Sequence, residues 1–481
     1  MKIGWFRRRR LDTRGPFATP PETRMTRIVV HGRWSSAGMF VLAASGATIG
    51  FNNIWHFPYL VGANGGGAFL IVYLFCVLVI GLPLLMAEVM LGRLGRASPI
   101  TAMRQLADRA RGDPNWVLVG WAGVLGGFLI LSYLSVIAGW ALAYVPRMAF
   151  GVLAGQTADG VASLFTQLVT DPEKQLFWHG LFVAATMLIA ARGLRAGIEP
   201  LVRYAAPLLF GLLAALLVYA ATTDAFTRAL AHLFQPDFTK LTMTGVVLAL
   251  GHAFFSLGLG AGVMLMYGAY LDDAAPVAGT SLLVVAVDTV AGLAAGVVVF
   301  SVLFAGGVDP AAGPGLAFQA LPLALDHLPL GRFPGTAFFL LLVVAAGLSA
   351  VALAEPALAW LTERFDISRA RAAVAGGAAV WLLGLISILS FDYWGFSFKF
   401  LGTVKRLGFF DILQILTVQV LLPLGAAAIA LFCGWVMKPE VTRAQLNLRT
   451  PCAYDAWLWL TRLAIPAALL IVFFNIPRLF L

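Results

Sequence analysis

The chain has 481 residues, of which 60% are hydrophobic and only 12% are charged, and its mean hydropathy is +0.88. A soluble domain of this length could not bury so much apolar surface, so the composition excludes an ordinary soluble protein and indicates a bilayer as the solvent. The net charge of +10 could fit a nucleic acid, but basic residues at the ends of apolar segments are typical of membrane orientation, so no nucleic-acid partner is expected.

The N-terminal segment, residues 1–33, carries the arginine run Arg7 to Arg10 and has no apolar core before Ala37. It therefore lacks the pattern of a cleavable signal peptide, and we predict a flexible basic arm that touches anionic lipid on the cytoplasmic side. Residues 34–481 are predicted to form a single transmembrane domain.

Eleven apolar segments follow the arm, most of them longer than the roughly 18 residues that a spanning helix requires. None shows the period-two alternation of a barrel strand, so the predicted fold class is an all-α integral membrane protein. The segments lie near 37–62, 66–92, 116–146, 176–191, 200–221, 243–270, 278–305, 335–362, 371–390, 408–437 and 456–477.

The basic residues predict the orientation of these spans. With the N-terminus inside, cytoplasmic segments would hold 23 of the 33 Lys and Arg residues, whereas the opposite orientation would place only nine or ten inside. The positive-inside rule therefore predicts a cytoplasmic N-terminus, and eleven spans then place the C-terminus outside.

Two of the spans are interrupted by clustered small residues. The first contains Ser45-Gly46-Ala47-Thr48-Ile49-Gly50, and the sixth contains Ser256-Leu257-Gly258-Leu259-Gly260-Ala261-Gly262. Unwound backbone at membrane depth is tolerated only where protein covers it or where it lines a cavity. The starts of these two spans are five spans apart, an odd number, as an inverted repeat requires. We predict a cargo or ion site between the two breaks, and close packing of helices through small residues is the alternative.

Several polar side chains lie inside apolar spans, where a buried ionisable group costs about 3 kcal/mol. Asp288 is the deepest, whereas Glu88 and Glu355 lie nearer cytoplasmic ends and are expected to cap or pair structurally. No nucleophile triad, HExxH or phosphate-binding loop occurs, and the three cysteines form no CxxC pair, so an enzyme is not expected. The full set is Asn52, Asn53, Glu88, Ser256, Asp288, Ser349 and Glu355.

Three segments resemble the neurotransmitter:sodium symporter family, in its bacterial eleven-helix branch. Arg33-Trp34 followed by GATIGFNNIWHFPYLVGANGGGAF is similar to the first-helix signature, GHAFFSLGLGAG to the sixth-helix break, and FFDILQILTVQVLLPLGAAAIALFCGWVMK to the tenth helix. The similarity runs from about 31 to 477. It implies a leucine-transporter-like fold: a 5+5 inverted repeat over about 37–221 and 243–437, one extra helix over about 456–477, and helices 1 and 6 unwound at mid-membrane.

The resemblance also implies positions for the sites. One sodium site would use Thr48, through its carbonyl, with Asn53, Ser256 and Asp288. A second would use the Gly46 and Ile49 carbonyls, a carbonyl at Ala345 or Ala346, and the Ser349 hydroxyl. Cargo would be lined by Ala47, Thr48, Phe51, Asn52, Ile130, Leu134, Phe255, Ser256, Gly258 and Ala261. The gates would be His56, Gln414 and Phe255 outside, and Arg33, Trp34, Tyr270 and Glu363 inside.

This sequence departs from the family pattern at those positions. Leu134 stands where the family has a tyrosine that binds the cargo carboxylate, and Asn52 replaces a glycine that approaches it. Asp288 replaces the asparagine of the first sodium site, and the second site keeps one hydroxyl where two usually occur. The outer Arg–Asp gate becomes His56 and Gln414, and the chloride-associated positions are Gly292 and His252. These changes imply that carboxylate recognition is lost and that a fixed anion has been gained.

The expected function is a sodium-coupled secondary transporter of a small organic solute (an amino-acid derivative, amine or zwitterion) in the plasma membrane of a bacterium. The alternatives are a proton-coupled, sodium-independent carrier and a non-transporting sensor or assembly subunit with the same fold. The expected cofactor is Na⁺, with no organic cofactor. The expected partners are the cargo, the lipid bilayer, and a second copy of the chain or a small membrane subunit.

Overall fold

The computed structural model describes residues 32–309, 315–391, 394–400 and 403–475. All but the last two residues of the predicted basic arm lie outside these ranges, as do the final two residues of the predicted extra helix. The described part is helical apart from one two-stranded sheet.

The first span is broken, as predicted from its glycines. Helix α1 (Ala37–Thr48) begins at Ser36, whose Oγ accepts a hydrogen bond from the Met39 N–H at 3.1 Å. After Thr48 the chain leaves the helix, because Ile49 has a ψ of 87°. It resumes as the π-helical turn η1 (Asn52–His56) and helix α2 (Phe57–Ala63), bent by 64° from α1.

The sixth predicted span is also divided. Helix α11 (Met243–Phe255) and helix α12 (Val263–Ala269) are separated by residues 256–262. Within that break Gly258, Gly260 and Gly262 have φ angles of 62°, 82° and 73°, in the left-handed region that only glycine adopts readily. The sequence therefore breaks both helices at the predicted glycine clusters.

Eight other helical segments are long and apolar enough to cross a bilayer, and the bent pair α1–α2 makes a ninth among the described residues. Helix α8 (Pro172–Ala190) and the pair α11–α12 lie where two further spans were predicted. The eight are α3–η2–α4 (Gly67–Cys76, Val77–Gly81, Leu82–Gly95), η3–α6 (Pro114–Trp116, Val117–Ala149), η4–α9 (Leu194–Ile198, Glu199–Ala221), α13 (Val277–Ala305), α15 (Arg332–Phe365), α16 (Arg369–Ser390), α17–η6–α18–η7 (Phe409–Gln414, Ile415–Leu421, Leu422–Leu431, Phe432–Val436) and α20–η8–α21 (Pro451–Trp459, Leu460–Ala464, Ile465–Phe474).

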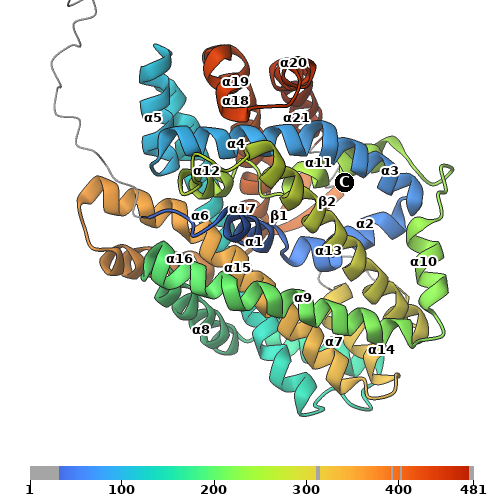
Figure 1. The fold of residues 1–481 in the computed structure, drawn as a ribbon. Helices are drawn as coiled ribbons and strands as arrows, with labels where there is room; N and C mark the ends of the chain where they lie inside the picture. Colours follow the sequence, from blue (N-terminus) through green and yellow to red (C-terminus); the bar gives the residue numbers. More distant parts are fainter. Residues whose placement is uncertain (1–31, 310–314, 392–393, 401–402, 476–481) are drawn as a thin grey trace, which may run out of the picture.

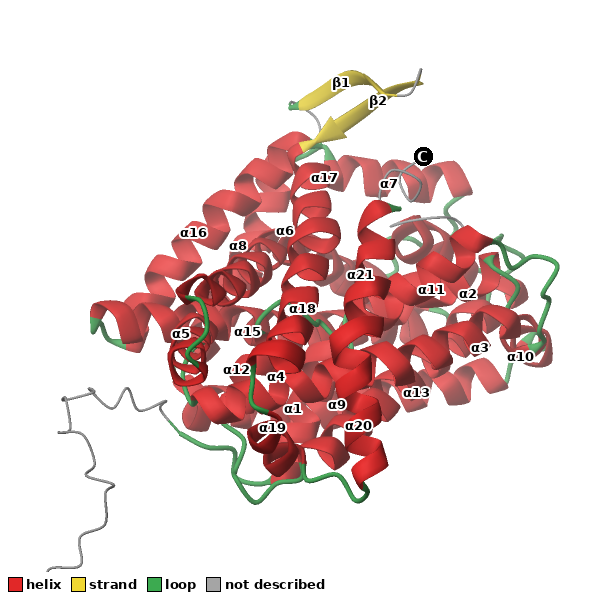
Figure 2. Cartoon of the chain, turned by 90° about the horizontal axis from the view of Figure 1, so that it is seen from above, coloured by secondary structure: helices red, strands yellow, loops and turns green. Residues whose placement is uncertain are grey.

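Shorter elements connect the spans. They are α5 (Pro99–Ala110), α7 (Ala158–Val169), α10 (Phe226–Phe234), η5 (Leu316–Ala320), α14 (Leu321–Asp326), α19 (Pro439–Leu446) and the antiparallel strands β1 (Gly395–Phe400) and β2 (Thr403–Gly408). The hairpin is an addition to the predicted all-α class, and Figure 2 shows it projecting from the bundle away from α5 and α19.

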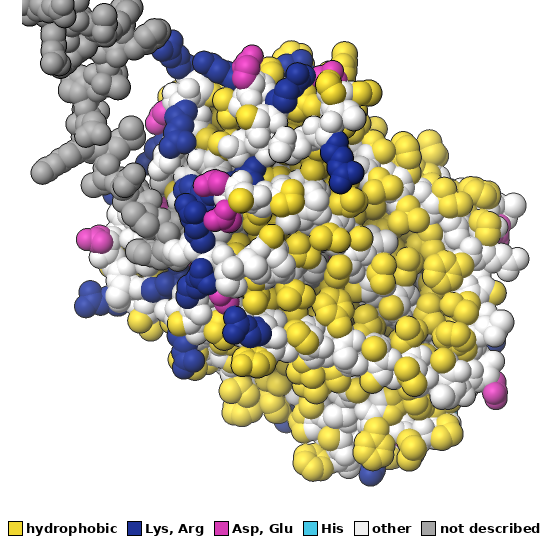
Figure 3. Space-filling view, in the orientation of Figure 1, with side chains coloured by type: hydrophobic (Ala, Val, Ile, Leu, Met, Phe, Trp, Pro, Cys, Tyr) yellow, Lys and Arg dark blue, Asp and Glu magenta, His cyan; other side chains and the backbone are white. Residues whose placement is uncertain are grey.

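Helix α1 lies at the centre of the bundle, where it packs against α9, α13 and α15 (Figure 1). The space-filling view shows basic side chains gathered toward one end of the molecule and a broad apolar surface over the rest of that face (Figure 3). We call the end that carries Arg33, Arg93 and Arg96 the basic end.

Three glycines after α2 contact the end of α10 and the residues that follow it. A Cβ atom on Gly65, Gly66 or Gly67 would lie 2.2–2.4 Å from the carbonyl oxygens of Asp237, His232 and Phe234 respectively. The Gly67 N–H donates to the Gln235 carbonyl at 3.1 Å, and the Asp237 N–H donates to the Gly65 carbonyl at 3.0 Å. No side chain larger than hydrogen fits at this backbone-to-backbone contact.

Candidate functional site

Three elements bring polar side chains together at the breaks. Asn53 of η1 donates from Nδ2 to Oδ1 of Asp288, on α13, at 2.8 Å, and both residues are buried. Ser256, at the end of α11, and Thr48, at the end of α1, lie beside the same carboxyl group. The four residues that the sequence placed in a first sodium site are therefore neighbours.

Three oxygen atoms of this cluster have no hydrogen-bond partner: Asn53 Oδ1, Ser256 Oγ and Asp288 Oδ2. An unpartnered buried polar atom costs about 1–3 kcal/mol, so three together indicate a ligand. The Thr48 hydroxyl donates to the Ser45 carbonyl at 3.0 Å, which leaves the Thr48 carbonyl, at the start of the break, as its available group. Carboxylate, amide, hydroxyl and carbonyl oxygens together suit a hard cation such as sodium.

Aromatic rings pack around Gly292 and His252, the positions that the resemblance associates with a chloride or a glutamate. The His252 ring stacks on Phe57 with centroids 4.8 Å apart, and it lies 5.7 Å from the Tyr73 ring. A Cβ atom on Gly292 would lie 3.1 Å from the Phe57 ring. These rings pack beside the cluster, whose carboxyl group is that of Asp288.

Most of the predicted cargo-lining residues lie in or next to the two breaks, and Ile130 and Leu134 lie on α6. Thr48, Phe51, Ser256 and Ala261 are buried, whereas the others keep intermediate exposure although they lie within helices or breaks of the core. A methyl group built on Gly258 would meet no atom within 4 Å, so open space adjoins that break. The partly exposed members are Ala47, Asn52, Ile130, Leu134, Phe255 and Gly258.

Tyr133 does not substitute for the missing tyrosine at position 134. Its hydroxyl lies 3.3 Å from the Thr417 hydroxyl on η6, and its side chain is buried. Leu134 therefore presents only methyl groups among the predicted lining residues, whereas Asn52 presents a partly exposed carboxamide.

Glu88 contacts the second break from α4. It was expected to cap or pair structurally near a cytoplasmic end, and its Oε1 does cap a backbone group: it accepts a hydrogen bond from the Gly260 N–H, at the centre of the second break, at 2.6 Å. The partner in the break was not predicted. The residue is fully buried in α4. Glu88 thus holds the break in shape, and the signal for it was its solitary charge within an apolar span.

The predicted second sodium position is surrounded by other groups than the cluster around Asp288. The Ser349 hydroxyl, on α15, donates to the Ala47 carbonyl at 3.0 Å. The side chain of the preceding residue, Leu348, packs on Gly46. One hydroxyl and an isobutyl group therefore face α1 at this place.

The predicted outer gate is not formed in this structure. No hydrogen bond joins His56 and Gln414, both of which are described, and Gln414 is exposed. The His56 ring instead lies 5.7 Å from the Trp55 ring and 6.3 Å from the His252 ring. Phe255 keeps intermediate exposure at the end of α11.

The residues predicted for the inner gate make other contacts than expected. The Trp34 indole donates to the Tyr267 carbonyl at 3.0 Å, and the Trp34 backbone N–H donates to the Tyr270 carbonyl at 3.0 Å. The Tyr270 hydroxyl donates to Glu355, which also pairs with Arg369. Glu355 is thus paired at the basic end, as the sequence predicted.

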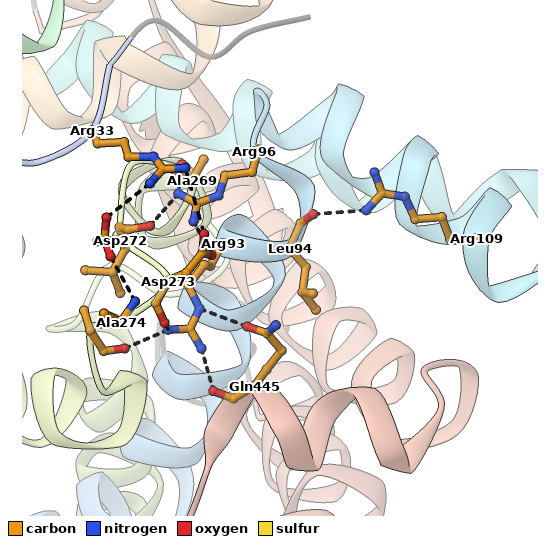
Figure 4. A network of polar contacts seen from close by, with 12 residues as sticks. Arg33, Arg93, Leu94, Arg96, Arg109, Ala269, Asp272, Asp273, Ala274 and Gln445 are labelled. Carbon is orange, nitrogen blue, oxygen red and sulfur yellow. Dashed lines mark hydrogen bonds and ion pairs between the residues drawn. The ribbon is translucent and has the colours of Figure 1, made fainter. Parts of the chain in front are cut away.

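Glu363 is not a partner of Arg33, although the resemblance placed both in one gate. Its carboxylate accepts from the backbone N–H of Ser98 at 2.8 Å and from the Ser98 hydroxyl at 2.5 Å, next to the start of α5. Arg33 reaches Asp272 at 3.2 Å instead (Figure 4). The loop after α12 therefore takes the acidic role predicted for Glu363.

A network of arginines surrounds this loop (Figure 4). Arg96 pairs with Asp273 and donates to the Leu271 carbonyl, and Arg93 donates to the Ala275 carbonyl at 2.7 Å. The backbone N–H of Ala274 and the neighbouring Arg33 lower the pKa of Asp272. The adjacent acidic residues after Tyr270 were the only sequence signal for this network.

The sequence and the fold of the chain are both similar to those of known proteins. The profile of the Sodium:neurotransmitter symporter family matches residues 31–158 and 177–428. The uncharacterized sodium-dependent transporter YhdH of Bacillus subtilis is 33% identical over 449 residues, which cover 92% of this chain and 97% of that protein. An uncharacterized sodium-dependent transporter of Haemophilus influenzae is 32% identical over 449 residues, with the same coverage. The crystal structure of MhsT in complex with L-phenylalanine has a TM-score of 0.82 and 39% identity, covering 92% of this chain and 99% of MhsT.

Proposed function

Because the chain belongs to the sodium:neurotransmitter symporter family, and is thus a transporter rather than an enzyme, we propose that it imports a small organic solute together with sodium. Import would proceed by alternating access across a bacterial plasma membrane. The proposal includes eleven spanning helices in a 5+5 inverted repeat plus one, with the basic end in the cytoplasm. The gathering of Lys and Arg at that end supports this orientation (Figure 3).

The observation that carries the proposal is the set of three unpartnered oxygens around Asp288. Sodium would be held by Asp288, Asn53, Ser256 and the Thr48 carbonyl, which come from both broken helices and from α13. A cation there would supply the positive charge that a buried carboxylate requires. It would also join the two breaks, so that cargo bound between them and sodium favour the same arrangement of helices.

The proposed cargo is an amino-acid derivative, an amine or another small zwitterion. MhsT has been crystallised with L-phenylalanine, which supports a cargo of amino-acid size. Leu134, however, offers no hydroxyl to a carboxylate, and Asn52 places a carboxamide among the lining residues. We therefore propose a ligand that lacks an α-carboxylate or presents it to Asn52.

A thermal-shift screen of purified protein against small amines and zwitterions, in sodium and in potassium at equal ionic strength, tests the proposal. We expect to find a solute that raises the melting temperature of the protein in sodium but not in potassium. In proteoliposomes, an inward sodium gradient should drive accumulation of the same solute. Stabilisation that follows pH and ignores sodium would support a proton-coupled carrier. Binding without accumulation would support a sensor or assembly subunit.

A further inference from the structure

A groove of about 400 Å³ opens on the surface of the described bundle where α8 gives way to η4 and α9. It is lined by Ile189 and Arg192, at and just after the end of α8, and by residues between Ala196 and Leu208 that recur at helical spacing on one face of η4–α9. Arg192 is the charged lining residue, and apart from Tyr204 the others are apolar. The groove is thus an apolar trough with a cation at one end.

The groove lies on a surface that faces lipid in a bilayer. Helix α9 runs along the outside of the bundle (Figure 1), and its apolar stretch has the smallest buried share of the eight described spans. Tyr204 and Leu208 are exposed there. From Ala196 to Leu208 the groove follows the helix for about 18 Å, which is close to the roughly 15 Å of hydrocarbon in one leaflet. An acyl chain of that leaflet therefore matches the groove in length and in polarity.

The cation of the groove lies at the basic end and is free to bind an anion. The start of α9 adjoins that end, because Glu199 accepts a hydrogen bond from the N–H of Ser35, two residues after Arg33, at 2.6 Å. Arg195 pairs with Glu199 at 3.3 Å. The guanidinium group of Arg192, by contrast, is exposed and has no ion pair or hydrogen bond with the described residues. Its charge is therefore available to a ligand in the groove.

The groove is held in shape without a ligand. Arg369, which pairs with Glu355, also donates from Nε to the Ala190 carbonyl, at the end of α8, at 3.0 Å. A Cβ atom on Gly197 would lie 2.1 Å from the Ile189 carbonyl oxygen, so η4 packs against α8 backbone to backbone. Since these contacts already fix the two elements, a ligand need not supply the ordering of its own site.

We propose that this groove binds one anionic phospholipid, with an acyl chain along α9 and the phosphate of the headgroup on Arg192. The pairing of a guanidinium group with a phosphate is charge-assisted, and basic pockets at the ends of spanning helices attract anionic headgroups. A neutral phospholipid fills the same trough but brings no net negative charge to Arg192. The placement of this lipid in the cytoplasmic leaflet rests on the orientation given with the proposed function; the binding itself does not.

Native mass spectrometry of the purified full-length protein, titrated with phosphatidylglycerol or with phosphatidylcholine of the same chains, tests the proposal without sodium or cargo. We expect one phosphatidylglycerol per chain to bind about fivefold more tightly than phosphatidylcholine, as one arginine near a headgroup provides. Arg192→Gln should remove this preference, and Arg192→Lys should keep most of it. Arg203→Gln is the matched control, because Arg203 is exposed on α9 but does not line the groove. Ala196→Trp, which fills the groove, should prevent binding of both lipids at this site.

Three outcomes would overturn the proposal. The first is a preference for phosphatidylglycerol that is the same in wild type, Arg192→Gln and Ala196→Trp. The second is equal competition by glycerol phosphate, which has the charge and no chain and would show that the site takes a soluble phosphate. The third is a dimer of the chain that Ala196→Trp dissociates, which would assign the groove to a second copy. Each of these results would leave the sodium-coupled function standing.

Discussion

Asn53 and Asp288 are joined by a hydrogen bond of 2.8 Å between a broken helix and an unbroken one, and each keeps an oxygen without a partner. The amide donates to one carboxylate oxygen, so the other oxygen and the amide oxygen remain for a cation. This pairing makes Asp288 the residue that most directly tests sodium binding.

Replacing Asp288 by Asn should weaken sodium binding by about 10- to 100-fold, because a charged ligand contributes about 1.5–3 kcal/mol. Sodium-dependent thermal stabilisation of the purified protein measures the effect. Glu199→Gln is the matched control, since Glu199 is also a buried carboxylate but accepts a hydrogen bond from the Ser35 N–H, far along the chain from this cluster. Equal sodium affinity in wild type and Asp288→Asn would contradict the proposed site.

Glu88→Ala should lower the free energy of unfolding by about 1–3 kcal/mol, because the Gly260 N–H would lose its partner inside the bundle. Glu88→Gln keeps an oxygen acceptor and should lose less. Melting temperatures of the two variants in detergent compare them. The role assigned to Glu88 is wrong if Gln is as damaging as Ala.

Leu134→Tyr should improve binding of ordinary α-amino acids such as leucine, to which wild type is expected to bind weakly or not at all. A hydroxyl donated to a carboxylate contributes about 1.5–3 kcal/mol, or about tenfold or more in affinity. Thermal shifts in leucine titrations provide the measurement, with Leu134→Phe as the control that lacks the hydroxyl. Tight, sodium-dependent leucine binding by wild type would refute this account.

The outer gate can be restored as a pair. His56→Arg with Gln414→Asp should favour the closed outer side more than the two single changes added together, with a coupling energy on the order of 1 kcal/mol. Accessibility of a cysteine introduced on the cargo-lining surface reports the closure. Independent effects of the two changes would show that these positions do not meet in any state.

The contact between Arg33 and Asp272 should not respond to pH between about 5 and 8. The pKa of Asp272 is lowered in the folded protein, so its contribution is complete above the ordinary aspartate value of about 3.9 and is lost only as the pH falls through the lowered pKa. Labelling of a cysteine at position 34 across this range tests the expectation, with Asp272→Asn as the reference. A transition near pH 6 would assign the titration to another group.

Helix positions could be predicted because each span is determined by its own apolar length and its own glycines. The seventh span, predicted over 278–305, is Val277–Ala305, and both glycine clusters mark breaks. Thr48, Asn53, Ser256 and Asp288 are far apart along the chain, but the family resemblance placed them together, and the structure makes them neighbours.

What depended on contacts between distant helices could not be predicted. Glu88 reaches Gly260 only because α4 packs against α12 and the break before it, and Glu363 lies on Ser98 rather than Arg33 because α5 begins beside it. His56 lies beside the Trp55 and His252 rings rather than Gln414, and these ring contacts come from how η1 packs against α11. The hairpin formed by β1 and β2 lies between two predicted spans, where hydropathy carries no information about strands.

The glycines at 65–67 let the backbone that follows α2 pack directly against the backbone of residues 232–237. Leu348 and Ser349 hold α1 through side chains, which a single substitution can alter, whereas the contact at Gly65–Gly67 has no side chain to exchange. Any side chain placed at Gly65, Gly66 or Gly67 has to push the backbone of residues 232–237 away, whatever residues stand there.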